Sequence, residues 1–120
     1  MEILINILKL IVAFTLINVW LFRFNQPTAY RGGNSKNMIE EFAEYGLSKW
    51  MLYLVGSMKI LIAVLIIYSI FNEDILFYIS SILAVLMIGA IFMHMRIKDP
   101  IYKSIPALSI LLIITIFILL

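Results

Sequence analysis

Apolar residues run along this chain in four long blocks separated by shorter polar segments, and the blocks cover residues 3–22, 50–71, 75–95 and 102–120. Because a helix needs roughly 20 apolar residues to cross the hydrocarbon layer of a membrane, each block has about the length of one span. No block shows the alternation that a barrel strand needs, and open sheet edges cannot be satisfied in lipid. The pattern predicts an all-α fold, an integral membrane four-helix bundle in a single domain over residues 1–120.

The composition agrees with an integral membrane protein. Hydrophobic residues make up 64% of the chain and charged residues 13%, and the mean hydropathy is +1.10, which leaves too little polar surface for a water-soluble domain. The net charge of +2 gives no reason to expect nucleic acid as a partner. The expected partners are the lipid bilayer and, within it, another membrane protein or further copies of the chain.

The chain contains no cysteine. Disulfides, thiolate nucleophiles and cysteine-bound zinc or iron–sulfur clusters are therefore excluded, and any redox chemistry must belong to a bound molecule or to a partner.

Lysine and arginine residues near the ends of the blocks predict the orientation. Seven of them lie in the first and third connections, namely Arg23, Arg31, Lys36, Lys49, Arg96, Lys98 and Lys103. The opposite face of the membrane has only Lys9. Because cytoplasmic connections carry the excess of positive charge, both termini are expected outside the cytoplasm, with the protein in a bacterial cytoplasmic membrane.

The first connection, residues 23–49, is long enough to contain structure of its own. Asn34 or Ser35 can cap a short amphipathic helix over residues 35–45, and Gly46 can end that helix in a left-handed conformation.

Glu41 falls on the apolar side of this short helix, which it shares with Met38, Phe42 and Tyr45. Two interpretations remain open. The helix can lie on the bilayer surface with Glu41 in water, or the connection can fold over the mouth of the bundle as a lid. The second arrangement would bring Glu41 and Arg31 against the ends of the spans.

Lys59 stands in the middle of the second block, roughly 14 Å along a helix that rises 1.5 Å per residue. Insertion scales assign a lysine at the bilayer centre a cost of about 2.5–3.5 kcal/mol, so a position facing the bundle interior is expected. Glu41 and Asn18 are the favoured partners, and the small residue Gly56 lets a neighbouring helix approach. The alternative is a lysine that extends along its own helix to the interface.

Other polar side chains share helix faces with apolar ones. Thr15, Asn18 and Phe22 fall on one face of the first block, and Ser80, Ala84, Met87, Ile91 and His94 on one face of the third. His94 is either an interfacial residue or a proton-exchanging group at the mouth of a cavity, because histidine ordinarily titrates near physiological pH. Asp99 follows on the membrane face that also carries Arg31, and it can orient a positive group there. Methionines flank His94, but adjacent helical residues point in different directions, so no metal site is expected.

Several of these motifs together resemble the DoxX-like family. They are Asn18 and Trp20, Tyr30-Arg31-Gly32, the stretch EEFAEYGL, the stretch VGSMKILIAVL, and HMRIKDP followed by Pro106-Ala107. The resemblance extends over nearly the whole chain and implies a four-helix membrane fold. It also implies divergent roles, because some relatives are linked as membrane subunits to quinone-dependent sulfur oxidation and an animal branch acts as receptor-assembly chaperones. A shared fold does not by itself transfer either function.

Two functions remain open. In the first, a lipophilic small molecule such as a quinone binds non-covalently in a cavity between the helices, with Phe14, Phe22 and Met87 facing its tail, and the protein serves as a binding protein or redox-accessory subunit. In the second, the protein is an assembly factor, a chaperone-like partner whose polar residues hold the bundle together. The residues of the ligand site or polar core are Asn18, Arg31, Glu41, Lys59, His94 and Asp99. No complete catalytic set is recognisable, so the chain is not expected to be an enzyme by itself.

Overall fold

The computed structural model describes residues 2–120, and all secondary structure within them is helical. Four helices are long and apolar enough to cross a membrane, over Glu2–Phe22, Lys49–Tyr68, Glu73–Arg96 and Ile101–Leu119. Their elements are α1 (Glu2–Ile17) with η1 (Asn18–Phe22), α3 (Lys49–Tyr68), η2 (Glu73–Ile75) with α4 (Leu76–Arg96), and η3 (Ile101–Ser104) with α5 (Ile105–Leu119). A short helix, α2 (Met38–Glu44), lies in the first connection. The predicted all-α membrane bundle of four helices is confirmed.

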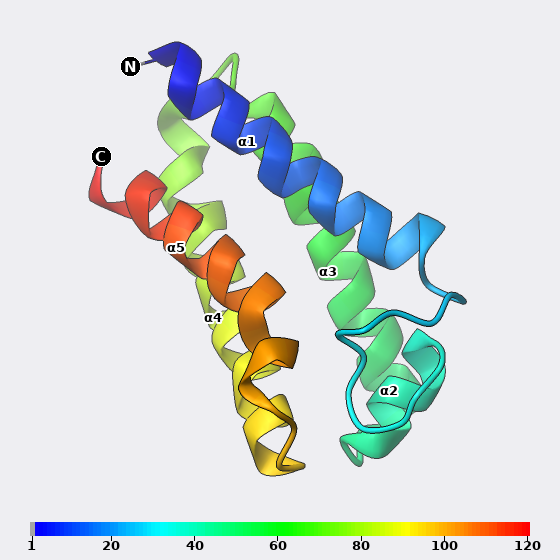
Figure 1. The fold of residues 1–120 in the computed structure, drawn as a ribbon. Coiled ribbons are helices and arrows are strands. Elements are labelled where there is room, and N and C mark those ends of the chain that lie inside the picture. Colours follow the sequence, from blue (N-terminus) through cyan, green and yellow to red (C-terminus); the bar gives the residue numbers. More distant parts are fainter. Residues whose placement is uncertain (1) are drawn as a thin grey trace.

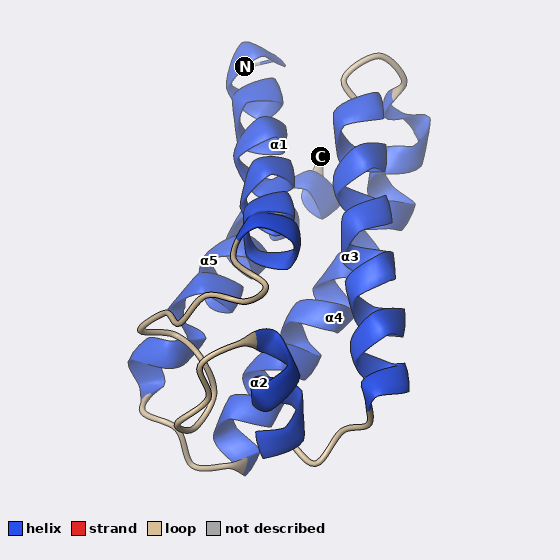
Figure 2. Cartoon of the chain, turned by 90° about the vertical axis from the view of Figure 1, so that its right-hand side faces the viewer, coloured by secondary structure: helices blue, strands red, loops and turns tan. Residues whose placement is uncertain are grey.

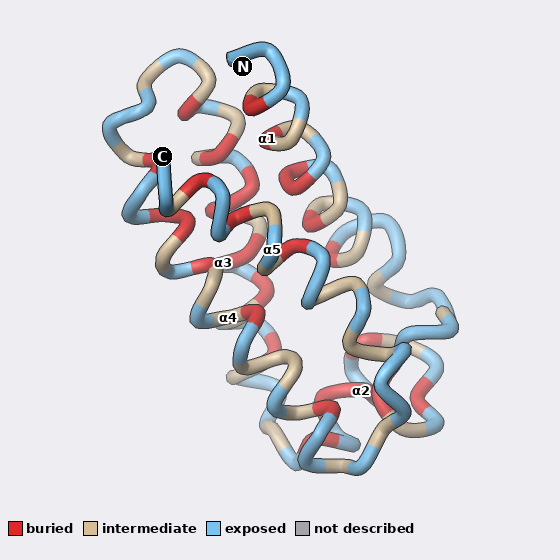
Figure 3. The backbone as a smooth tube through the Cα atoms, turned by 60° about the vertical axis from the view of Figure 1, so that its left-hand side comes forward, coloured by how far each residue is buried: buried red, intermediate tan, exposed pale blue. Residues whose placement is uncertain are grey.

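The four spans form two antiparallel pairs, with α1 packed along α3 and α4 along α5 (Figure 1). Both termini lie at one end of the bundle, and α2 lies with the first and third connections at the other end (Figure 2). Buried residues follow the inward faces of the helices, while the outward faces expose large apolar side chains (Figure 3). Such outward faces are suited to lipid, which accepts apolar side chains as readily as a protein core does.

The two ends of the bundle have different cores. Towards the termini, mostly aliphatic side chains from all four spans form the core, and the most deeply buried are Val12, Ala13, Ala63, Ile66, Leu83 and Ile114. Towards α2, the core is largely aromatic and consists of Trp20, Met38, Phe42, Tyr45 and Leu52. The first connection, called the lid loop from here on (residues 23–48), therefore folds back under the bundle and contributes to its core.

Helix α2 starts three residues later than the sequence pattern indicated, because Asn37 caps it. The Asn37 side-chain oxygen accepts the Glu40 N–H at 2.8 Å, and the Glu40 carboxylate accepts from the Asn37 side-chain amide at 3.0 Å. Ser35 instead closes a turn by donating its hydroxyl to the Gly32 carbonyl at 2.5 Å. Gly46 has the expected left-handed conformation, with φ of 79°.

Gly56 of α3 makes room for Trp20. A Cβ atom at Gly56 would lie 2.7 Å from Cε3 and Cζ3 of the indole ring. The ring comes from η1, a π-helical turn in which the Arg23 N–H donates to the Asn18 carbonyl five residues earlier, at 2.8 Å. Isolated π turns of this kind frequently occur at functional sites.

Replacing Gly56 by alanine should lower the free energy of unfolding by about 1–3 kcal/mol, because the added methyl group overlaps the Trp20 ring. The matched control is Gly89→Ala in α4, where a Cβ meets nothing within 4 Å. Thermal unfolding in mild detergent, followed by circular dichroism, compares the two. Combining Gly56→Ala with Trp20→Leu should cost less than the two single losses added together. Equal stability of the two glycine variants would contradict this packing contact.

Candidate functional site

Lys59 lies inside the bundle with 8% of its surface exposed. It is ten residues after Lys49, the start of α3, and so about 15 Å along the helix. Its Nζ lies 5.3 Å from the centroid of the Trp20 ring, a cation–π distance. Within residues 2–120 its ammonium makes no hydrogen bond and has no carboxylate within 4.0 Å. An aromatic face therefore takes the place of the partner expected from Glu41 or Asn18.

Glu41 is paired with Arg31 rather than with Lys59. Its Oε2 lies 3.5 Å from Arg31 Nη1, and its Oε1 accepts the Gly32 N–H at 2.7 Å. Both side chains of the pair are nearly inaccessible to solvent. The pairing follows from the path of the lid loop, which places Arg31 beside α2 before the chain enters α3. Glu41 thus faces the bundle rather than water, as the lid interpretation requires.

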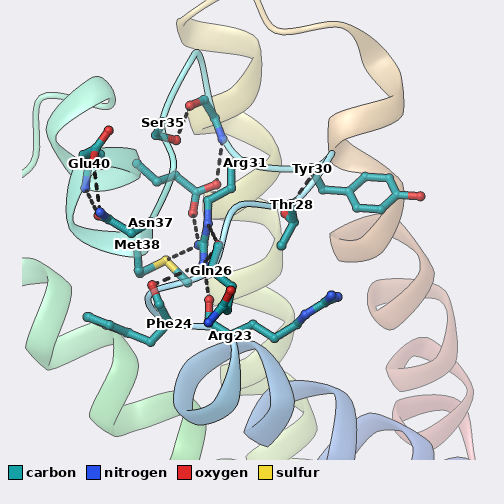
Figure 4. Close-up of polar contacts among 12 residues, drawn as sticks. Arg23, Phe24, Gln26, Thr28, Tyr30, Arg31, Ser35, Asn37, Met38 and Glu40 are labelled. Atoms are coloured by element: carbon teal, nitrogen blue, oxygen red, sulfur yellow. Dashed lines mark hydrogen bonds and ion pairs between the residues drawn. The ribbon is translucent and has the colours of Figure 1, made fainter.

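Arg31 also folds the lid loop around itself (Figure 4). Its guanidinium donates to the backbone carbonyls of Arg23, Phe24 and Gln26, and to the Met38 sulfur at 3.4 Å. These contacts occupy most of the donors of the guanidinium. Arg31 lies at the edge of the candidate site, but its geometry is that of a residue that shapes the loop.

His94 and Asp99 meet at the end of α4. His94 Nδ1 lies 2.7 Å from Asp99 Oδ2. The chain makes this contact possible by turning back on itself, because Lys98 adopts the left-handed conformation (φ of 61°) and the Asp99 N–H donates to the His94 carbonyl at 2.9 Å. The carboxylate also accepts the Gly33 N–H at 3.0 Å and lies 3.7 Å from Lys103 Nζ. Lys103 in turn donates to the Gly33 carbonyl at 2.7 Å, so this cluster ties the lid loop to the α4–α5 connection.

Tyr45 completes the cluster from α2, with its hydroxyl 3.3 Å from His94 Nε2. Burial and the negative charges of Glu41 and Asp99 raise the pKa of Tyr45, so its phenol stays protonated and can donate. Burial alone would raise the pKa of Asp99, but hydrogen bonds from His94 and Gly33 and the charge of Lys103 outweigh it, and the net pKa is lowered. Asp99 at Nδ1 and Tyr45 at Nε2 therefore hold the His94 ring in place from both sides.

Two cavities meet at Lys59. One, of about 180 Å³, extends towards α1 and α5, and the other, of about 260 Å³, extends between α3 and α4. Both are lined by Trp20, Glu41, Lys59, Ala90 and His94, among others. The remaining walls of the α3–α4 cavity are mostly apolar, whereas those of the α1–α5 cavity also include Arg23, Arg31 and Lys103. Val85, 69% exposed on the outer face of α4, lies at the rim of the α3–α4 cavity, which therefore opens towards lipid.

The other residues expected at the site divide into three groups. Asn18 lies at the exposed rim of the α1–α5 cavity, and Met87 lies buried in its wall. Asp99 lines neither cavity and acts through His94. The placement of Phe14 and Phe22 towards a ligand tail is wrong, because they are 60% and 74% exposed on the outer surface.

The inward face of the first span is a stripe of buried residues that the sequence motifs do not include. Ile5, Lys9, Val12, Leu16 and Trp20 are all buried, at intervals of three or four residues. Lys9 is fully buried rather than being a charge at the membrane surface, and its Nζ donates to the Ser69 carbonyl at 3.2 Å and to Glu73 Oε1 at 3.4 Å. The spacing of the stripe is the signal that could have identified both Lys9 and Trp20.

A family model described as DoxX-like matches residues 7–118. Among curated proteins and among solved structures, nothing matches the chain. The matched region includes most or all of each of the four spans and every residue of the site described above.

Replacing Glu41 by alanine should destabilise the protein by about 3–5 kcal/mol, because Arg31 would become a buried charge without a carboxylate. The control is Glu44→Ala, which removes an exposed carboxylate from the same helix. Limited proteolysis of residues 23–48 and thermal unfolding are the measurements. The double variant Arg31→Met with Glu41→Leu should recover only part of the loss, because the carbonyls that Arg31 contacts then lose their donor. If Glu41→Ala is as stable as Glu44→Ala, the buried pair is not holding the lid loop.

Proposed function

The chain belongs to the DoxX-like family and is a multi-pass integral membrane protein, and on that premise we propose that it binds a lipophilic small molecule by a polar head group at Lys59. The observation that supports this proposal is the environment of the Lys59 ammonium. It lies deep in the spanning region, beside two cavities, and among residues 2–120 only the Trp20 ring is its partner. A head group that accepts a hydrogen bond would offset the cost of placing a lysine there.

The residues around Lys59 have separate roles in this proposal. Lys59 donates to the head group, and Trp20 provides a flat surface against it. Tyr45 and His94 form the wall of the site on the side of the lid loop, and Asp99 orients the imidazole of His94. Arg31 and Glu41 close the mouth of the bundle, while Asn18 lies where a ligand would enter the α1–α5 cavity. Apolar side chains in both cavity walls contact the tail.

A quinone is one ligand whose chemistry fits these donors. Its carbonyl oxygen can accept from Lys59, and its ring can stack on Trp20. When bound, a quinone would supply the electron-carrying chemistry, which a chain without cysteine would leave to its ligand or to a partner subunit. In that form the protein would be a membrane redox-accessory subunit.

An assembly role is the second candidate, and one observation favours it. Arg31, Glu41, His94 and Asp99 all have partners within the chain. In this second function, the paired side chains hold the lid loop on the bundle and have no ligand. The apolar outer faces of the helices then pack against another membrane protein or a second copy of the chain.

Positive charges support a cytoplasmic position for the lid loop. Five basic residues are exposed at that end, namely Arg23, Lys36, Lys49, Arg96 and Lys98. At the opposite end Lys9 is buried against Glu73 and so adds no basic residue to the membrane surface. We therefore place both termini on the external face of a cytoplasmic membrane.

Reporter fusions at Leu120 test this orientation. A reporter that is active only outside the cytoplasm should give signal, while one that is active only inside should not. The same pair of reporters inserted after Lys36, in the exposed part of the lid loop, should give the reverse result. A cytoplasmic signal at Leu120 would overturn the proposed orientation.

The ligand itself can be sought by mass spectrometry of protein purified in mild detergent. A lipophilic compound should co-purify with the wild-type chain and be reduced at least several-fold in Lys59→Met and in His94→Ala. The control is Lys36→Met, which removes an exposed lysine of the lid loop. If all four proteins carry the same compounds in the same amounts, Lys59 does not bind a ligand and the assembly role becomes the better account.

A further inference from the structure

The ionisable groups buried at the lid-loop end leave one positive charge unmatched. Arg31 and Glu41 form a neutral pair at 3.5 Å. Asp99 and Lys103 form a second pair at 3.7 Å, and His94 is a further hydrogen-bond partner of Asp99. Lys59 is the cation that remains, and its ammonium is held against an uncharged ring.

The opposite end of the bundle shows how this fold satisfies a buried lysine. Lys9 is fully buried, and its Nζ contacts a carboxylate oxygen of Glu73 and the carbonyl oxygen of Ser69. Lys59 is buried to a similar extent but has neither kind of contact within the described chain. Lys59 thus lacks both the carboxylate and the carbonyl contact that Lys9 has, and only the carboxylate would also neutralise its charge.

The depth of Lys59 limits where a negative group could come from. Lys59 is about 15 Å from the start of α3, near the middle of a hydrocarbon layer roughly 30 Å thick. The phosphates of bilayer lipids lie at the edges of that layer. A phospholipid would have to bring its glycerol and both chains to the midplane, whereas a carboxylate at the end of a single chain can enter from the lipid.

The α3–α4 cavity has a size and an opening that suit such a molecule. Its volume of about 260 Å³ is below the range of roughly 300–1,000 Å³ that encloses a whole drug-sized ligand. Its rim reaches the lipid at Val85, and its walls include Val55, Leu86 and Met93. A head group and the first methylenes of a chain can occupy the cavity while the rest of the chain stays in the bilayer.

We infer that the ligand is a single-chain amphiphile with a carboxylate head group, such as a long-chain fatty acid anion, whose carboxylate pairs with Lys59. This inference rests on the proposed function and narrows it to monoanionic ligands. The carboxylate oxygens accept hydrogen bonds from Lys59 Nζ, and the Trp20 ring covers another side of the ammonium. The resulting ion pair gives Lys59 the carboxylate that Glu73 gives Lys9.

Competition binding with the full chain in nanodiscs of neutral phosphatidylcholine tests the charge preference. Radiolabelled palmitate is the probe, and the competitors are unlabelled palmitate, hexadecanol, a short-chain ubiquinone and phosphatidylglycerol. Palmitate should bind at least about tenfold more tightly than hexadecanol, which has the same chain without the charge. Lys59→Met should abolish that ratio and Lys59→Arg should retain it, while Lys36→Met should behave as the wild type.

The other outcomes separate the two proposals. If palmitate and hexadecanol compete equally and Lys59→Met weakens both, the carboxylate inference is overturned while ligand binding at Lys59 stands. If ubiquinone displaces the probe better than unlabelled palmitate does, the carboxylate inference is likewise overturned and ligand binding at Lys59 stands. The head group would then be a neutral carbonyl. If phosphatidylglycerol displaces the probe at the same concentrations as unlabelled palmitate, the ligand is a phosphodiester lipid. The inference of a single-chain ligand would then be overturned. If no compound binds above nanodiscs without protein, both the inference and the proposed function fail.

Discussion

A positive charge in the hydrocarbon layer costs roughly 2.5–3.5 kcal/mol on insertion scales, and the arrangement of this bundle depends on how it meets that cost at Lys59. Gly56 lets Trp20 approach α3, and the π turn at η1 is the segment that carries Trp20. The indole face then lies against the ammonium. Helix α2 folds beneath this group and adds Phe42, which packs edge-on against Trp20. The aromatic core at this end is therefore built around a lysine.

The two ends of the bundle deal with a buried lysine differently. Lys9 is paired within the chain and sits beside a largely aliphatic core, which suits a structural role. Lys59 adjoins two cavities beneath a loop that is attached by a small number of polar contacts, chiefly those of Gly33 with Asp99 and Lys103. A polar group buried without full compensation is costly to stability, and such groups are commonly retained at sites of function.

Much of the fold could be predicted from the sequence, because the length of an apolar block is set directly by membrane thickness. The inward position of Lys59 followed from the same physics. The residues that contact Lys59 could not be predicted in this way. The partner of Glu41 depends on the path of the lid loop, which places Arg31 closer to Glu41 than Lys59 is. The contact of His94 with Asp99 depends on the left-handed turn at Lys98, a conformation that lysine rarely adopts. Trp20 and the Asn37 cap could have been identified from the sequence, the first from its spacing with Leu16 and the second from the glutamate three residues after Asn37.

The central claim is that a ligand head group meets the charge of Lys59. Solid-state NMR can measure this directly in membranes that contain the ¹⁵N-lysine-labelled protein and palmitate labelled with ¹³C at the carboxyl carbon. The account predicts a dipolar coupling between that carbon and one lysine Nζ, at a distance below about 4 Å, which disappears in Lys59→Met. Bound palmitate whose carboxyl carbon shows no coupling to any lysine nitrogen would contradict it.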